Sequence, residues 1–101
     1  MNIIVVRYKV QADRAQENID FISAVFAELQ EKAPPGLRYA SFNLEDGVSF
    51  VHVAAVDDDI ESNPLPAMDA FKRFSADIRD RCEEPPVVAS ASVVGAYNVF
   101  S

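Results

Sequence analysis

Several features that would mark a particular class of protein are scarce in this 101-residue sequence. A single cysteine cannot form an internal disulfide, which agrees with a cytoplasmic location. Nine lysine and arginine residues against sixteen acidic residues give a formal charge of −7, which argues against binding to nucleic acid or to an anionic membrane. The three glycines are isolated, so the sequence has no glycine-rich motif that would cradle a phosphate.

Long apolar runs are missing as well. No stretch of about twenty apolar residues occurs, so we expect no membrane-spanning helix. The start, MNIIVVRYKV, has no basic segment before its apolar run and no small-residue cleavage pattern after it, so we expect no signal peptide. The composition is that of a soluble globular chain, and its length predicts one domain over residues 1–101.

The strongest local pattern is a hairpin between Leu37 and Val56, where two alternating runs meet at Asp46-Gly47. Asp-Gly in this setting favours a type I′ turn, which needs positive φ at both residues. The resulting register pairs Tyr39 with Ala54, Ser41 with His52, and Phe42 with Val51.

Side chains alternate along a strand, so this register divides the hairpin into two faces. The first face is apolar and is predicted to lie under helices; it comprises Ala40, Phe42, Leu44, Val51 and Val53. The second mixes aromatic, hydroxyl, amide and imidazole groups; it comprises Tyr39, Ser41, Asn43, Phe50, His52 and Ala54. A plain solvated surface is not expected to collect such groups, so we expect the functional site on this second face.

The segment before the hairpin predicts a strand and a helix. Residues 3–10, IIVVRYKV, are β-branched and aromatic and predict the first strand. Asp13 and Gln16 have the spacing of a capping box, so a helix should begin there, and Pro34-Pro35-Gly36 should end it. The buried face of this helix is predicted to contain Ala15, Ile19, Ile22, Phe26 and Leu29.

The segment after the hairpin predicts a second helix and a last strand. Asn63 is expected to cap the helix, with Pro64 at its first position. Glu83-Glu84-Pro85-Pro86 should stop it, and residues 87–100 predict a strand with Gly95 as a bulge or bend. The apolar side of the helix is predicted to contain Ala67, Met68, Phe71, Phe74, Ile78 and Cys82.

The order strand, helix, strand, strand, helix, strand predicts an α+β fold, a ferredoxin-like βαββαβ unit with a four-stranded antiparallel sheet and both helices on one face. The other face stays open. We place Tyr39, Phe50 and His52 on it, together with Ile3 and Val5 from the first strand. This is more apolar area than a monomer exposes comfortably, so we predict a homodimer formed through the open sheet face.

Four stretches together resemble a known superfamily: VVRYKVQADRAQENIDFI, PPGLRYASFNLEDGVSFVHV, PLPAMDAFKRF and RCEEPPVVASASVVGAY. Across residues 2–100 the chain resembles the dimeric α/β-barrel superfamily, in particular small domains of the antibiotic-biosynthesis monooxygenase family. The resemblance lies in the order, length and patterning of the elements. It implies a dimeric α/β barrel, and the family includes oxygenases that use no metal or organic cofactor, haem-degrading enzymes and proteins without an assigned activity.

The sequence departs from this family in one respect. The haem-degrading branch and the quinone-forming oxygenases typically have a tryptophan in the pocket, and this chain has none. Their catalytic sets are therefore not carried over to this sequence, and haem binding is disfavoured. We expect no cofactor.

His52 is the sharpest candidate for chemistry. A histidine that projects from a central strand into a pocket can act as a general base toward a phenolic substrate. The alternative is a histidine that is simply hydrogen-bonded at the dimer interface. We expect no metal site, because one histidine without a cysteine or carboxylate partner at ligand spacing makes no first coordination shell.

Tyr39, Asn43, Phe50 and Arg7 are predicted to bind the substrate beside His52, with Asn43 or Arg7 stabilising developing enolate charge. The alternatives are a polar dimer seam and, for Phe50, plain core or interface bulk. The resemblance then implies a cofactor-independent monooxygenase of aromatic or polyketide-like small molecules. The alternative function is a non-catalytic protein of the same fold that binds a small ligand or serves assembly.

Two further features are assigned to structure. Cys82 lies on the apolar stripe of the predicted second helix, so we expect a buried small side chain and not a nucleophile. The acidic run from Asp57 to Glu61 lacks the glycine and the spacing of a calcium loop, so we expect a solvated loop.

Overall fold

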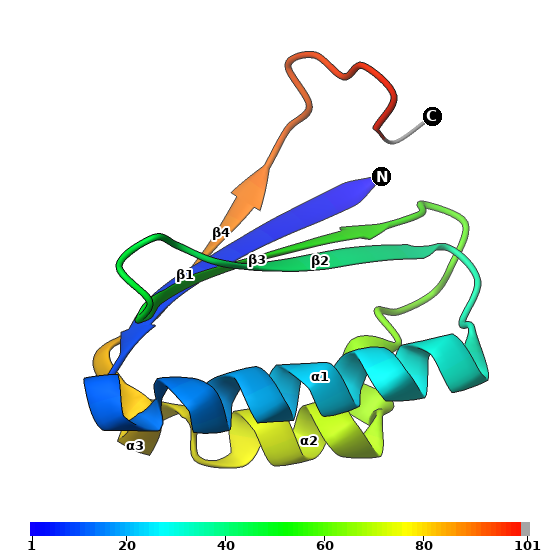
Figure 1. Cartoon of the computed structure of the whole chain (residues 1–101). Coiled ribbons are helices and arrows are strands. Elements are labelled where there is room, and N and C mark those ends of the chain that lie inside the picture. The colour runs from blue at the N-terminus through cyan, green and yellow to red at the C-terminus, as the bar shows by residue number, and fades with distance from the viewer. Residues whose placement is uncertain (100–101) are drawn as a thin grey trace.

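The computed structural model describes residues 1–99. A four-stranded antiparallel sheet has the strand order β2-β3-β1-β4, and the helices all cover the same face of it (Figure 1). The strands are β1 (Asn2–Val10), β2 (Leu37–Asn43), β3 (Ser49–Val56) and β4 (Cys82–Ala91). The helices are α1 (Ala15–Lys32), α2 (Asp69–Ala76) and α3 (Ile78–Arg81), with short 3-10 segments η1 (Ala12–Arg14) and η2 (Leu65–Ala67). This is the predicted α+β ferredoxin-like arrangement. Among residues 1–99, no helix is long and apolar enough to cross a membrane.

The hairpin register is the predicted one, but the turn is different. Of the two turn residues Asp46 and Gly47, only Gly47 has a positive φ, at 81°, so the predicted type I′ turn is wrong. The Gly47 N–H donates to the carbonyl of Leu44, and the Asp46 carboxylate accepts the backbone N–H groups of Val48 and Ser49. The side chain of Asp46 therefore holds the turn by hydrogen bonding, without itself adopting a left-handed conformation. The pairs formed are Tyr39 with Ala54, Ser41 with His52, and Phe42 with Val51.

The two faces of the hairpin are oriented opposite to the prediction. Phe50 and His52 lie under the helices and are 2% and 4% exposed. Phe42 and Leu44, which were predicted to be covered, lie on the open face and are 51% and 46% exposed. The physical reason is that His52 has protein hydrogen-bond partners beneath the helices, so burying it there leaves no polar group unsatisfied.

Helix α1 starts later than predicted. Residues Ala12–Arg14 form the 3-10 segment η1, and no side chain caps either element, so the predicted capping box is wrong. Gln16 instead donates to Asp20 one turn further along α1, at 3.0 Å. Val25 of this helix is buried in the core, and Ala15, Ile19, Ile22 and Leu29 of the predicted face pack against that core.

The predicted second helix is divided into pieces. Asn63 accepts the N–H of Leu65, but the N-cap position of η2 is occupied by Pro64, so the predicted cap at Asn63 with Pro64 as the first helical residue is wrong. The backbone then leaves helical geometry at Met68, with φ −80° and ψ 136°, and again at Asp77, with φ −127° and ψ 27°. These interruptions separate η2, α2 and α3, and α3 ends at Arg81.

Strand β4 also differs from the prediction. It begins at Cys82, so this residue lies in a strand and the predicted start at residue 87 is wrong. Pro85 and Pro86 are tolerated inside it because β4 is an edge strand that pairs only with β1. The strand ends at Ala91, and Phe100, the predicted last residue, lies outside the described residues.

The core lies between the sheet and the helices. Its buried members come from β1, α1, β3 and the segments around α2, and they include Tyr8, Val10, Val25, Phe50, Leu65, Met68 and Phe74. Within residues 1–99, no helix covers the opposite face of the sheet (Figure 1). That face carries the exposed side chains of Phe42 and Val87. The molecule therefore has one covered sheet face and one open sheet face.

Candidate functional site

His52 on β3 is hydrogen-bonded at both ring nitrogens. Its Nε2 lies 2.7 Å from the hydroxyl of Tyr8 on β1. Its Nδ1 lies 2.7 Å from the hydroxyl of Tyr39 and 2.7 Å from Oγ of Ser41, both on β2. The pairing of His52 with Ser41, together with alternation along β1 and β2, places all of these groups on the covered face.

The polar contacts continue past Tyr8 into the helices. Nδ2 of Asn18, which is fully buried in α1, donates to the Tyr8 hydroxyl at 2.8 Å. Oδ1 of Asn18 accepts from Nε of Arg81 at 3.1 Å, and the Arg81 side chain is also fully buried. The remaining guanidinium nitrogens donate to the Asp77 carboxylate and to the carbonyl of Phe74. A continuous buried chain of hydrogen bonds therefore runs from Arg81 to His52; we call it the Arg81–His52 chain.

Burial sets the protonation of these groups. It lowers the pKa of His52 to about 4, so the imidazole is uncharged at neutral pH. Burial raises the pKa of Tyr8, more than the hydrogen bond from Asn18 lowers it. Burial likewise raises the pKa of Tyr39, partly offset by a hydrogen bond from Ser41. Both phenols are therefore protonated at neutral pH and remain hydrogen-bond donors.

A cavity of about 250 Å³ adjoins this group of side chains, between the sheet and α2. His52, Tyr8 and Tyr39 supply its polar wall, while Phe71 and Phe74 are among its apolar lining residues. The rings of His52 and Phe74 have centroids 5.4 Å apart. A mostly apolar cavity with a few polar groups on one side is typical of a small-molecule site.

The structure brings together some of the predicted site residues and separates others. Tyr39 contacts His52 directly, and Phe50 shares the covered face through its ring stack with Tyr8, at 5.5 Å between centroids. Asn43 is exposed at the end of β2, where its amide donates to the carbonyl of Ser49. Arg7 pairs with Val51 and lies on the open face, so its predicted place beside His52 is wrong. Alternation along β1, which puts Tyr8 on the covered face, necessarily puts Arg7 on the other.

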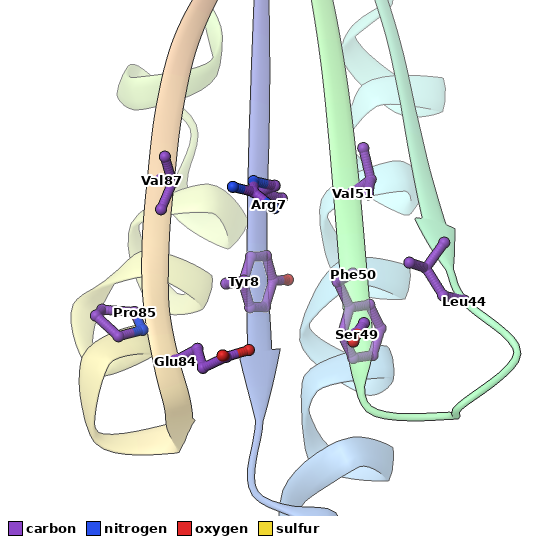
Figure 2. Close-up of a pocket in the computed structure, with 9 residues that line it drawn as sticks. All are labelled: Arg7, Tyr8, Leu44, Ser49, Phe50, Val51, Glu84, Pro85 and Val87. Carbon is purple, nitrogen blue, oxygen red and sulfur yellow. The ribbon is translucent and has the colours of Figure 1, made fainter.

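A second hollow, of about 330 Å³, lies on the open sheet face. Figure 2 shows Arg7 and Val51 on neighbouring strands there, with Val87 on β4 and the helices behind the sheet. Its lining combines apolar side chains with the charges of Arg7 and Glu84, and it lies on the side of the sheet opposite His52. We therefore assign the chemistry to the cavity under the helices.

Cys82 and the acidic loop, the two remaining candidates, are still assigned to structure and not to chemistry. Burial raises the pKa of the Cys82 thiol, which makes it a poor nucleophile. In the acidic loop, Asp57 pairs with Arg38 at 3.0 Å. Within residues 1–99, no cluster of three or more histidine, cysteine or acidic side chains could hold a metal ion.

The sequence predictions did not include Asn18 or Arg81. Both lie on apolar helical stripes: Asn18 is three residues after Ala15, and Arg81 is three residues after Ile78. A polar residue on such a stripe signals a buried hydrogen-bonded group. In the charged segment RDRCEE, however, Arg81 resembles a surface residue, and only its tertiary partners distinguish it.

No family model matches the sequence, and no curated protein does either. Solved structures do match. An antibiotic biosynthesis monooxygenase is 13% identical with a TM-score of 0.76, over 94% of this chain and 100% of that one. The cofactor-independent oxygenase SnoaB from Streptomyces nogalater is 16% identical with a TM-score of 0.69, over 96% of each chain.

A dimeric ferredoxin-like protein of unknown function from Jannaschia is 14% identical with a TM-score of 0.67, over 91% of this chain and 98% of that one. These identities are too low to transfer an activity, but the coverage extends over nearly the whole of each chain. The chain therefore has the fold of the antibiotic-biosynthesis-monooxygenase-like proteins, as its sequence resemblance implied.

Proposed function

We propose that this protein binds a small aromatic or polyketide-like molecule in the cavity under the helices and oxidises it with molecular oxygen, without a cofactor. The observation that carries the proposal is the apolar cavity with His52, Tyr8 and Tyr39 along one wall. The fold shared with a cofactor-independent oxygenase supports it.

The chemistry requires a base and a dry site. A phenolic substrate whose hydroxyl proton passes through the hydroxyl of Tyr8 to Nε2 of neutral His52 becomes an electron-rich phenolate that can reduce oxygen. The net reaction converts a ring C–H of the phenol to a quinone C=O, with one oxygen atom entering the product and the other leaving as water. The low pKa of His52 makes it a weak base by itself, but the phenolate formed beside it stabilises the imidazolium in a site of low dielectric.

The substrate contacts follow from the cavity walls. Phe71 and Phe74 offer aromatic surface to a ring, and Tyr39 offers a hydroxyl to an oxygen of the substrate. Phe50 supports the site from behind Tyr8. Arg7 and Asn43 are not part of this proposal, because they lie away from the cavity lining.

The test is oxygen uptake with a panel of hydroquinones that includes 1,4-dihydroxynaphthalene. We expect turnover by the wild type and a loss of at least a hundredfold in His52→Ala, the scale of a lost general base. Ser75→Ala is the matched control, because Ser75 lines the same cavity but hydrogen-bonds only to backbone carbonyls of its own helix. An absence of turnover across the panel, or full activity in His52→Ala, would overturn the proposal.

A second candidate is a non-catalytic protein that binds a ligand in the same cavity. One observation favours it: every buried side-chain nitrogen and oxygen in the described part of the chain has a hydrogen-bond partner, and both ring nitrogens of His52 are occupied. Saturable binding of the hydroquinones without oxygen uptake would select this candidate over the first.

We also propose that two copies of the chain associate through the open sheet face. Support comes from the exposed apolar side chains of Phe42, Leu44 and Val87, which are 51%, 46% and 53% exposed on a face without helices. Large apolar side chains exposed together on one face often mark an interface. The cytoplasmic location stays a prediction from the sequence.

A further inference from the structure

The buried end of the Arg81–His52 chain is a group that can only donate hydrogen bonds. The guanidinium of Arg81 is fully buried, with its Cζ 4.5 Å from the centre of the Phe21 ring. An arginine side chain has no acceptor atom and stays protonated in proteins. Each of its three partners, Asn18, Asp77 and the Phe74 carbonyl, must therefore present an oxygen to it.

We propose that Arg81, through Asn18 and Tyr8, fixes His52 as the tautomer that carries its proton on Nδ1, and thereby makes the Tyr39 hydroxyl a hydrogen-bond donor toward the cavity. Arg81 and Asn18 are positioning residues in this scheme, since neither lines the cavity. The tautomer follows from the hydrogen bonds alone. The role of Tyr39 toward a ligand rests on the proposed function.

The first step is the orientation of the Asn18 amide. The oxygen and nitrogen of an amide are told apart by their hydrogen-bond partners. Because Arg81 donates, Oδ1 of Asn18 must face it, and Nδ2 must then face Tyr8 at 2.8 Å. The Tyr8 oxygen is consequently an acceptor toward Asn18.

The second step is the hydrogen bond between Tyr8 and His52, whose direction follows from that of the Asn18–Tyr8 bond. A tyrosine hydroxyl has one hydrogen, and the hydrogen of Tyr8 is not used toward Asn18. Its other close polar neighbour is Nε2 of His52 at 2.7 Å. Tyr8 therefore donates to Nε2, which must be the unprotonated nitrogen of the neutral ring, and the proton resides on Nδ1.

The third step reaches the cavity. With its proton on Nδ1, His52 donates toward the hydroxyls of Tyr39 and Ser41, each 2.7 Å away. The oxygen of Tyr39 is therefore used as an acceptor toward Nδ1 of His52. The hydrogen of Tyr39 is then left for a ligand, because Tyr39 lines the cavity. A ligand with a carbonyl or phenolate oxygen would accept it.

Nitrogen-15 NMR of the imidazole tests the tautomer directly in the ligand-free protein at pH 7, without any need for activity. His52 is the only histidine in the sequence, so a protein purified without a histidine tag gives an unambiguous signal. We expect Nδ1 to give the signal of a protonated nitrogen and Nε2 that of an unprotonated one. The opposite assignment, or equal populations of the two tautomers, would overturn the proposal.

Asn18→Asp should reverse the direction of the hydrogen bonds that link residue 18, Tyr8 and His52. An aspartate accepts from both sides, so it would accept from Arg81 and also from Tyr8, and the Tyr8 oxygen would then accept from His52. The proton should move from Nδ1 to Nε2. Gln16→Glu is the matched control, since it makes the same charge change at an exposed position on α1 and should leave the tautomer unchanged. An Asn18→Asp protein that keeps the proton on Nδ1 would contradict the proposal.

Tyr8→Phe provides an independent test in case Asn18→Asp does not fold. It removes the one donor to Nε2 that the described residues supply, so both tautomers should become populated. A Tyr8→Phe protein that keeps Nδ1 fully protonated would show that Tyr39 and Ser41 set the tautomer, and would overturn the role of Arg81.

The donor role of Tyr39 is tested with two probes of similar shape, 1,4-naphthoquinone and naphthalene. Tyr39→Phe should weaken naphthoquinone binding about tenfold, the scale of one lost hydrogen bond, and leave naphthalene binding unchanged. Equal effects on the two probes would contradict a donor role. If neither probe binds, the proposed function and the role of Tyr39 both fail, whereas the tautomer is still decided by NMR.

Discussion

The two faces of the sheet are made from the same strands, yet they have opposite character. The covered face buries polar groups, His52 and Tyr8 among them, in a complete set of hydrogen bonds. The open face exposes apolar groups, such as Phe42 and Val87, to solvent. Adjacent residues of one strand thus serve different purposes: His52 belongs to the cavity, and its neighbour Val51 to the open face.

This contrast reverses the usual relation between polarity and burial. Polar groups are buried at little net cost when every partner is present, and apolar groups are exposed when a second surface is to cover them. The proposals above divide along the same line: ligand binding and chemistry are proposed for the covered face, and association is proposed for the open face.

The largest effect is expected from breaking the buried chain at Arg81. Arg81→Met should lower the free energy of unfolding by about 3–5 kcal/mol, because it leaves the partners of a buried charge unsatisfied. Arg38→Met is the control on the open face, where the pair with Asp57 is exposed and should contribute less than about 1 kcal/mol. Urea unfolding measures both. Equal losses in the two variants would remove the distinction between the faces.

The next effect is a dependence of stability on pH. The pKa of His52 is about 4 in the folded protein, below its ordinary value near 6.5, so the unfolded chain binds more protons between these two pH values. The contribution of His52 to the free energy of unfolding should therefore be greatest above pH 6.5. It should fall by about 3 kcal/mol as the pH decreases to 4. Acidic residues titrate in the same range, so the measurement is the difference between wild type and His52→Gln in urea unfolding at pH 7 and pH 4. Identical pH dependence in the two proteins would contradict the burial of a neutral His52.

A smaller effect is expected on the open face. Phe42→Asp should weaken the proposed dimer by about 2 kcal/mol, or about thirtyfold in dissociation constant, because it places a charge in an apolar contact. Ala27→Asp makes the same charge on the exposed side of α1 and should not affect association. Light scattering over a range of concentrations reports the result. A wild type that is monomeric at micromolar concentration would refute the dimer itself.

The smallest effect is expected at the edge of the polar site. Ser41→Ala should lower the free energy of unfolding, measured by urea unfolding, by about 1 kcal/mol. The loss is small because Tyr39 remains as a partner for Nδ1 of His52. Ser92→Ala, in the exposed segment after β4, should change stability by less than about 0.5 kcal/mol. A loss at Ser41 as large as that at Arg81 would mean that the whole chain depends on this one hydroxyl.

The sequence predicted the element order and the hairpin register because both depend on local signals. Alternation and the turn at Asp46-Gly47 determine which residues pair and which share a face. They do not determine which face meets the helices, since both faces contain large apolar side chains. The presence of His52 and Tyr39 on one face suggested exposure, whereas their partners on β1 and α1 made burial favourable.

The candidate site could be predicted only in part for the same reason. His52, Tyr39 and Phe50 share a face by alternation, and the structure places them together on the covered face. Arg7 was misplaced because the relation of β1 to the hairpin depends on long-range pairing. Arg81 required the approach of α1 to the end of α3, which no local pattern encodes.

The two prolines of β4 have a consequence for the shape of any assembly. Pro85 and Pro86 lack N–H groups, and they lie on a strand whose outer side pairs with nothing in the described chain. Another strand that approached this side would find donors missing, beside the negative charges of Glu83 and Glu84. This border of the sheet is therefore protected against strand-by-strand growth into fibrils.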